Sequence, residues 1–108
     1  MSFEVRTISA FEKEFKKLSK KYPSLKSDLF KLIKQLEANP FIGTSLGKDF
    51  YKIRLSISSK AKGKSGGARI IACVKIIQNI IYLGAIYDKS EKSSITDSEL
   101  KLLAKKIG

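Results

Sequence analysis

The hydrophobic pattern of the first 40 residues predicts one short strand followed by two amphipathic helices. Apolar and polar side chains alternate in residues 3–7, as they do in a half-buried strand. Apolar residues then recur at helical spacing over residues 11–22 and again over 25–38, and a proline follows each of these stretches. Ser9 with Glu12 three positions later predicts a capping box at the start of the first helix.

The pattern of apolar residues in the second half of the chain predicts mainly strands. Residues 41–49 show neither period and contain two glycines, so we expect a loop there. Residues 50–58 alternate cleanly, with apolar side chains on one face and basic or hydroxyl side chains on the other. Residues 68–77 and 80–87 are rich in β-branched side chains and predict two further strands.

A closing helix and a short strand connection complete the predicted topology. Thr96 and Glu99 match a second capping box, and apolar residues follow at helical spacing. The last three strands must be mainly antiparallel, because their connections are too short for crossovers. We therefore expect an α+β fold of order β-α-α-β-β-β-α, in which the two N-terminal helices cover one face of a twisted sheet. The length fits a single domain over residues 1–108.

The connection between the last two strands decides which way Tyr87 faces. A two-residue turn at Gln78–Asn79 would pair residue 69 with residue 88. Tyr87 would then lie on the core face of the sheet with Ile70, which is the arrangement we expect. A three-residue turn or a β-bulge would reverse this and place Tyr87 beside Arg69.

Composition narrows the possible chemistry. The 108 residues include 22 Lys and Arg against 10 Asp and Glu, a net charge of +12, with no His and one Cys. The lack of His excludes His-based nucleases, catalytic triads and His-ligated zinc sites, and no metal site is expected. Cys73 stands among apolar residues and is expected to be a buried structural thiol.

The surplus of positive charge favours an acidic partner such as nucleic acid, an acidic protein or an anionic membrane. The N-terminus lacks the pattern of a signal peptide, and the longest apolar run is too short to cross a membrane. We expect a cytoplasmic protein that does not use a membrane as its partner.

More than half of the surplus charge lies between Lys48 and Lys92, where ten basic residues face three acidic ones. Such a cluster can contact a phosphate backbone with guanidinium forks and ammonium groups. A solvated basic surface with a flexible loop is the plain alternative. The basic residues that the alternation, the loop and the strand ends single out are Lys52, Arg54, Lys60, Lys62, Lys64, Arg69, Lys89 and Lys92.

Four segments of the chain carry a recognisable pattern. They are Lys52-Ile53-Arg54, the run from Gly63 to Ile71, Ile81-Tyr82-Leu83, and the run from Ile86 to Lys92. These segments resemble the RelE/ParE superfamily of bacterial toxins, and within it the HigB-like branch. The order of elements also matches, so the resemblance extends over nearly the whole chain and is strongest from Lys52 to Lys92.

The resemblance implies a toxin that a cognate antitoxin, acidic or carrying a helix-turn-helix, holds inactive. Most RelE-like toxins cleave messenger RNA in the A site of the 70S ribosome without a cofactor, whereas ParE-like toxins poison DNA gyrase. The basic residues of the family match Lys52 and Arg54, then Arg69, then Lys89 to Lys92. Two family positions, an arginine and a late tyrosine, are occupied here by Ser90 and Thr96.

We therefore expect an endoribonuclease in which the RNA supplies its own 2′-hydroxyl as the nucleophile. Arg54 and Arg69 would stabilise the charge at phosphorus, and a lysine crowded by other cations would be the base. The residues expected to be catalytic are Arg54, Arg69, Lys89 and Lys92, and those expected to bind RNA are Lys52, Lys60, Lys62 and Lys64. A gyrase poison and a degenerate basic RNA-binding module remain the alternatives.

Overall fold

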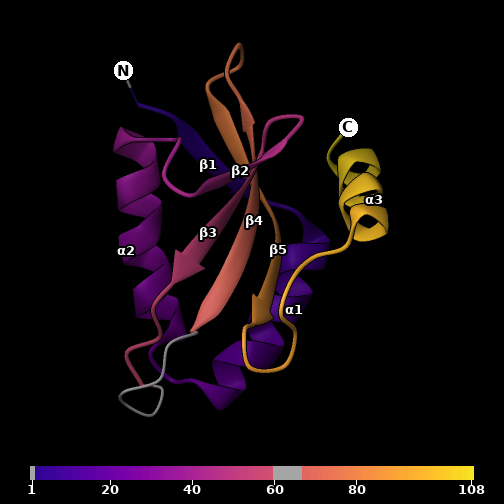
Figure 1. Cartoon of the computed structure of the whole chain (residues 1–108). Coiled ribbons are helices and arrows are strands. Elements are labelled where there is room, and N and C mark those ends of the chain that lie inside the picture. The colour runs from indigo at the N-terminus through magenta and orange to yellow at the C-terminus, as the bar shows by residue number, and fades with distance from the viewer. Residues whose placement is uncertain (1, 60–66) are drawn as a thin grey trace.

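Within residues 2–59 and 67–108, which the computed structural model describes, the chain forms three helices and five strands (Figure 1). The predicted α+β class and the predicted order of helices are confirmed, and one strand is added. The elements are β1 (Glu4–Thr7), α1 (Ser9–Lys21), α2 (Leu25–Ala38), β2 (Thr44–Gly47), β3 (Phe50–Leu55), β4 (Ala68–Lys75), β5 (Ile80–Asp88) and α3 (Asp97–Ile107).

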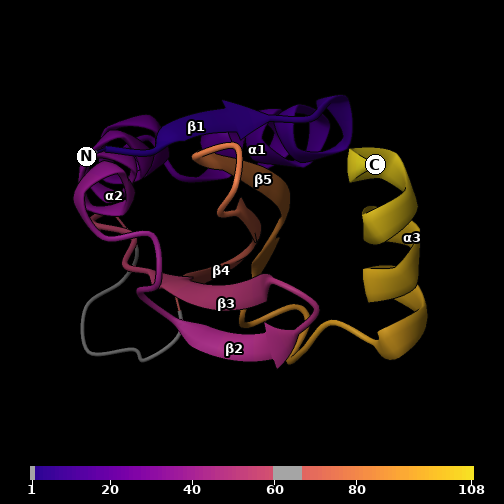
Figure 2. The ribbon, with the colours of Figure 1, turned by 90° about the horizontal axis from the view of Figure 1, so that it is seen from above.

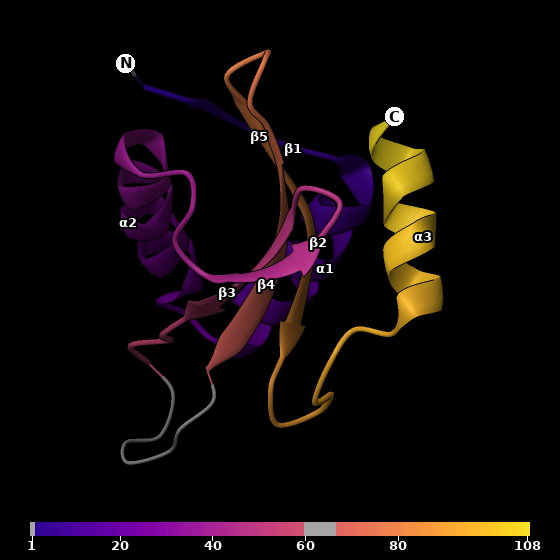
Figure 3. The same cartoon turned by 45° about the horizontal axis from the view of Figure 1, so that its top comes forward.

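All five strands form one sheet, in the spatial order β1-β5-β4-β3-β2. β1 pairs with β5 in parallel, and the other neighbours are antiparallel, as the short connections required. β1 and β2 are therefore the two edges of the sheet, which is strongly curved when seen from above (Figures 2 and 3).

The two N-terminal helices cover one face of this sheet, as predicted. Their apolar stripes meet side chains of alternate residues on β3, β4 and β5, which gives a continuous core. Because strand side chains alternate between the two faces, the intervening residues of the same strands must point to the opposite side. The fully or almost fully buried members of this core include Phe11, Leu25, Leu36, Ile70, Val74, Ile81 and Leu83.

The second face of the sheet is covered only in part. α3 lies on this side, opposite α1 and α2 (Figure 2), and Leu103 packs with Phe50, Ile71 and Cys73 in a smaller cluster. Cys73 is thus a buried thiol, as predicted, and burial raises its pKa. The part of the face that α3 leaves open carries the basic residues of β3 and β4.

The strand β2 lies inside the segment that we predicted to be a loop. It forms a hairpin with β3, and the two connecting residues, Lys48 and Asp49, have φ angles of 51° and 69°. Tight hairpin turns of this kind usually contain Asn-Gly, because both central residues must adopt positive φ. The Lys-Asp pair satisfies the turn without that sequence signal, so the hairpin was missed.

Of the two predicted capping boxes, only the second exists. Thr96 accepts a hydrogen bond from the backbone of Glu99, and the Glu99 carboxylate accepts one from the backbone of Thr96. The box predicted at Ser9 is wrong, because the N-cap of α1 is Ile8, whose side chain makes no cap hydrogen bond. Glu12 instead accepts a hydrogen bond from the hydroxyl of Thr7.

The predicted register between β4 and β5 is also wrong. Lys75 pairs with Ile80, so the connection contains four residues rather than two. A β-bulge then leaves Gly84 without a partner, and beyond it Arg69 pairs with Tyr87. Tyr87 consequently lies on the same face of the sheet as Arg69, and not in the core beneath α1 and α2.

A buried carboxylate connects the start of α2 to the end of β3. Asp28 accepts hydrogen bonds from the Ser24 hydroxyl at 2.7 Å, from the Ser58 amide at 2.9 Å and from the Ser58 hydroxyl at 2.6 Å. Ser24 in turn accepts a hydrogen bond from the amide of Ser59. Although burial alone would raise the pKa of Asp28, these hydrogen bonds lower it below its usual value.

We expect Asp28→Ala to destabilise the fold by about 2–3 kcal/mol at pH 7, because hydrogen bonds to a buried carboxylate are lost. A carboxyl whose pKa is lower in the folded state stabilises the protein above its unfolded pKa of about 4. That contribution disappears as the pH falls through the folded pKa. Urea unfolding should therefore show a larger gap between wild type and variant at pH 7 than at pH 3. A gap that does not change with pH would contradict the role of the charge.

Candidate functional site

Three side chains from three adjacent strands form a row across the open face of the sheet. Arg54 on β3 pairs directly with Arg69 on β4, and Arg69 pairs with Tyr87 on β5. Side chains that face one another in this way have Cβ atoms about 5 Å apart. We call this set the Arg54–Arg69–Tyr87 row. It places two arginines at directly paired positions of neighbouring strands, so that both guanidinium groups can reach one phosphate group.

The two arginines differ in burial. Arg69 is only 9 % exposed, and its Nη1 donates a hydrogen bond to the Ala68 carbonyl at 3.2 Å, whereas Arg54 is exposed. The site therefore combines one guanidinium held by the protein with one that is accessible to solvent. Lys52, two residues before Arg54 and half-buried, shares its face of β3 because alternate residues of a strand point the same way.

The segment that follows β5 brings further basic residues to this end of the sheet. The amide of Lys89 donates to the carbonyl of Gly67 at 3.0 Å, so the pairing with the start of β4 extends one residue past the strand. The amides of Glu91 and Lys92 both donate to the carbonyl of Asp88, which closes a tight turn. Lys89 and Lys92 are thus carried by an ordered backbone.

The side chain of Asp88 anchors this turn and is fully buried. Its carboxylate accepts hydrogen bonds from the Tyr22 hydroxyl at 2.6 Å and from the amide and hydroxyl of Ser90 at 2.9 and 2.7 Å. Lys21 lies 3.7 Å from the same carboxylate. The end of α1 therefore holds the turn that carries Lys89 and Lys92.

The hydroxyl of Tyr87 is buried and makes no hydrogen bond with any residue that the structure describes. Burial raises the pKa of this phenol, and the positive charges of Arg69 and Lys92 offset only part of the effect. A phenol with a raised pKa is protonated at neutral pH. Tyr87 can therefore donate a proton or a hydrogen bond at this site, but it is a poor base.

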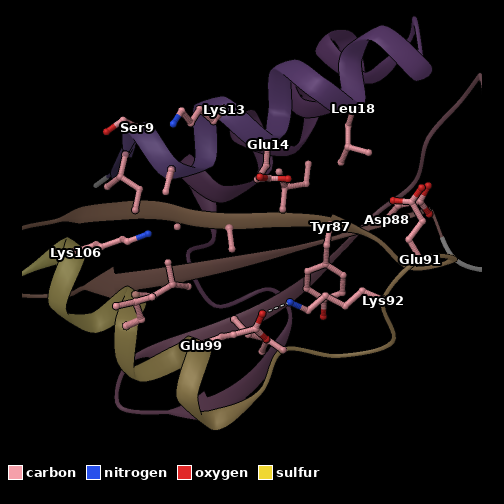
Figure 4. A pocket seen from close by; sticks show the side chains of 18 residues that line it. Ser9, Lys13, Glu14, Leu18, Tyr87, Asp88, Glu91, Lys92, Glu99 and Lys106 are labelled. Carbon is pink, nitrogen blue, oxygen red and sulfur yellow. Dashed lines mark hydrogen bonds and ion pairs between the residues drawn. The ribbon is translucent and has the colours of Figure 1, made fainter.

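Lys92 lies between Tyr87 and α3 (Figure 4). Its Nζ atom is 5.6 Å from the centre of the Tyr87 ring, a cation–π contact, and it forms an ion pair with Glu99. The hydrogen bond from Lys92 is the main cause that lowers the pKa of Glu99. Glu99 thus serves two groups, since the same side chain also caps α3.

The structure gathers most of the sequence-predicted residues at one end of the open face. Lys52, Arg54 and Arg69 share that face, and Lys89 and Lys92 follow from the adjoining turn. The remaining three, Lys60, Lys62 and Lys64, lie outside the described residues.

Three further residues shape the site. From the sequence, Tyr87 was expected in the core and Glu99 only in a helix cap, and Asp88 was given no role. A glycine inside a strand pattern is the signal that could have placed Tyr87 correctly, because it often marks a bulge. The two positions that depart from the family have structural roles here. Ser90 donates to Asp88, and Thr96 caps α3.

In the described part of the chain, no group of three or more His, Cys, Asp or Glu side chains is placed to hold a metal ion. None of its helices has the length and apolar character needed to span a bilayer.

Gly84 allows α3 to lie directly against β5. A Cβ atom at this position would meet side-chain atoms of Leu103 and Ile107 at 3.4 Å, an ordinary contact distance, and the φ angle is not positive. We expect Gly84→Ala to be tolerated. Gly84→Val should displace α3 and destabilise the protein by about 1–3 kcal/mol, because added methyl groups have no space. Hydrogen exchange of the α3 amides measures this, and unchanged protection in the valine variant would contradict it.

The chain matches the family model described as the RelE toxin of the RelE/RelB toxin-antitoxin system, over residues 10–107. No curated protein sequence matches it. Among solved structures it is similar to the E. coli toxin RelE, determined as a double mutant in the free state, with 17 % identity and a TM-score of 0.66 over the whole of both chains. At this identity the structural match shows the fold alone, while the family match covers almost all of the sequence. The chain belongs to the RelE toxin family of toxin-antitoxin systems.

Proposed function

We propose that this protein is an endoribonuclease that cleaves messenger RNA on the ribosome and so blocks translation. The observation that carries the proposal is the direct cross-strand pairing of Arg54 with Arg69, which puts two arginines at opposed positions on the same sheet face. Membership of the RelE toxin family supports the same activity.

The reaction begins when the 2′-hydroxyl oxygen of one nucleotide attacks the adjacent phosphorus atom. The bond from O2′ to phosphorus forms, and the bond from phosphorus to the 5′-oxygen of the next nucleotide breaks. A base removes the proton of the 2′-hydroxyl, and an acid gives a proton to the leaving 5′-oxygen. The products are a 2′,3′-cyclic phosphate and a free 5′-hydroxyl, so atoms and charge balance without a co-reactant.

Arg54 and Arg69 stabilise the negative charge that develops on the phosphoryl oxygens. Their planar forks can each donate two parallel hydrogen bonds, and the buried position of Arg69 fixes its direction in advance. Lys52 lies next to Arg54 on the same face and adds a further positive charge along the path of the RNA backbone.

Tyr87 is the proposed proton donor, because its phenol, whose pKa burial raises, is protonated at neutral pH and because the residue pairs with Arg69 in the row. The base is one of the three lysines Lys52, Lys89 and Lys92. Of these, Lys92 is engaged by Glu99 in the free protein, so it must exchange this carboxylate for the RNA before it can take part.

The same features support a requirement for the ribosome. The chain contains no His, and its proton donor is buried in the free protein. Such a site gains most from a partner that holds the RNA in a reactive geometry, because orientation alone contributes many orders of magnitude to a rate. The net charge of +12 favours association with ribosomal RNA.

Expression of the chain without an antitoxin tests the proposal. We expect growth arrest, and primer extension should reveal cuts within translated messages at positions that correspond to the ribosomal A site. A message that lacks a start codon is the control, and it should stay intact. Arrest with intact messages and broken DNA would instead support a gyrase poison. Unimpaired growth would favour a degenerate RNA-binding module.

A further inference from the structure

A groove runs between α1 and α3, with the C-terminal part of β5 as its floor (Figure 4). Its volume is about 920 Å³, which is large for a protein of this size. We call it the α1–α3 groove. It begins near the start of α1 and ends at Tyr87, Lys92 and Asp88, so it leads directly into the site described above.

The floor and the inner walls of the groove are mainly apolar. Gly84, Ala85 and Ile86 form the floor, and Ile8 and Leu103 contribute from the two sides. Leu102 lines the α3 wall and is 54 % exposed, although it is a large aliphatic side chain. An exposed leucine at the wall of a wide apolar groove is a feature of protein interaction surfaces.

The acidic side chains around the groove have ion-pair partners, whereas two of its lysines have none among the described residues. Each of the four acidic residues already has a cationic neighbour: Glu14 is 3.8 Å from Lys17, Asp88 and Glu91 are 3.7 and 3.1 Å from Lys21, and Glu99 is bound to Lys92. In contrast, Lys13 on α1 and Lys106 on α3 form no ion pair with any residue that the structure describes. These two lysines lie at the same end of the groove, on opposite walls (Figure 4).

This pattern distinguishes the groove from the Arg54–Arg69–Tyr87 row. The row carries only positive charge and suits a polyanion, whereas the groove adds acidic side chains and an apolar floor. RNA phosphates would be repelled by the four carboxylates along its length. An amphipathic polypeptide, with apolar residues on one face and acidic residues at one end, would complement both the floor and the two unpaired lysines.

We propose that the α1–α3 groove is the docking site of the antitoxin, which inserts an amphipathic segment between the two helices and leaves α3 in place. Carboxylates of this segment contact Lys13 and Lys106, and its apolar side chains contact Leu102 and the floor. The inference rests on the toxin function proposed above. Because the groove ends at Tyr87 and Lys92, a bound segment also covers the proton donor, which inactivates the toxin directly.

A pair of charge-reversal variants with identical net charge tests the proposal. Lys13→Glu with Lys106→Glu changes the groove, and Lys16→Glu with Lys105→Glu changes neighbouring exposed positions of the same helices outside it. We expect the groove variant to bind purified cognate antitoxin about 10- to 100-fold more weakly, and the control variant to bind nearly as tightly as wild type. Equal weakening in both variants would overturn the assignment.

Toxicity is read separately, so that failure of the docking site and failure of the proposed function are distinguishable. None of the four lysines belongs to the proposed catalytic site, so the groove variant should still arrest growth but resist neutralisation by the antitoxin. If wild type does not arrest growth, the proposed function fails, while the binding measurement still decides the docking site.

Two further measurements keep the test independent of charge. Leu102→Asp should weaken antitoxin binding, whereas Ile77→Asp, at a position that is 98 % exposed in the connection from β4 to β5, should not. Hydrogen exchange of the complex should show that residues 97–107 keep their protection. Loss of that protection would mean that the antitoxin displaces α3, and would overturn the proposal.

Discussion

Replacing Arg54 and Arg69 together with alanine is expected to abolish growth arrest and RNA cleavage while the chain still folds. Each guanidinium stabilises the charge that develops on the phosphoryl oxygens, and removal of one such donor typically reduces a rate by about 10²- to 10³-fold. Loss of both should leave no measurable cleavage. Neither side chain belongs to the core beneath α1 and α2, so we expect the variant to keep the fold.

The matched control is Arg6→Ala. Arg6 is the one arginine of the chain outside the proposed site, and it lies on β1, at the opposite edge of the sheet from β2 and β3. This variant should remain fully toxic. Arg54→Lys and Arg69→Lys provide a finer test, since lysine keeps the charge but loses the planar fork. Growth arrest and primer extension give the activity, and circular dichroism verifies the fold. Full toxicity of the double alanine variant would refute the site.

The second large effect is expected at Asp88. Asp88→Ala removes the acceptor for Tyr22 and Ser90 and leaves the buried hydroxyl of Tyr22 without this partner. We expect a loss of about 3 kcal/mol in the free energy of unfolding, because several hydrogen bonds to a buried carboxylate are lost at once. The turn that carries Lys89 and Lys92 should also lose its order, so activity should fall even where the variant is fully folded.

Tyr22→Phe is the companion variant, because it deletes only one of these hydrogen bonds and leaves the turn closed by Ser90. We expect it to lose about 1 kcal/mol of stability and little activity. Urea unfolding measures the stabilities, and hydrogen exchange of residues 89–92 reports the order of the turn. If Asp88→Ala were as stable as wild type, the carboxylate could not be the anchor that we describe.

The helices show how far a sequence of this kind determines its fold. α2 has the bounds that the apolar period and the following Asn39-Pro40 predicted, and α3 begins with the predicted box at Thr96. The identical signature at Ser9 failed because Ile8 occupies the N-cap position and Thr7 binds Glu12. A capping signature is local, but the path by which the chain enters a helix depends on tertiary packing.

The site was predictable only in part for a similar reason. Alternation along residues 50–58 correctly separated Arg54 from the buried side chains, and the start of the next strand located Arg69. The relation of these arginines to Tyr87 depends on one unpaired residue in β5, which periodicity does not reveal. The partner of Lys92 was equally hidden, because Glu99 lies seven residues away and serves the helix cap as well.

The bulge at Gly84 has a consequence for how this family of sequences can change in length. Upstream of it, residues can be added to or lost from the four-residue connection between β4 and β5 with a limited effect, since that connection is a solvent-exposed turn. Between Gly84 and Tyr87, by contrast, the loss of one residue would exchange the two faces for every side chain that follows. In this segment the number of residues is therefore constrained more strongly than their identity. An insertion or deletion there alters which residues lie on the open face of the sheet, even when no amino acid is substituted.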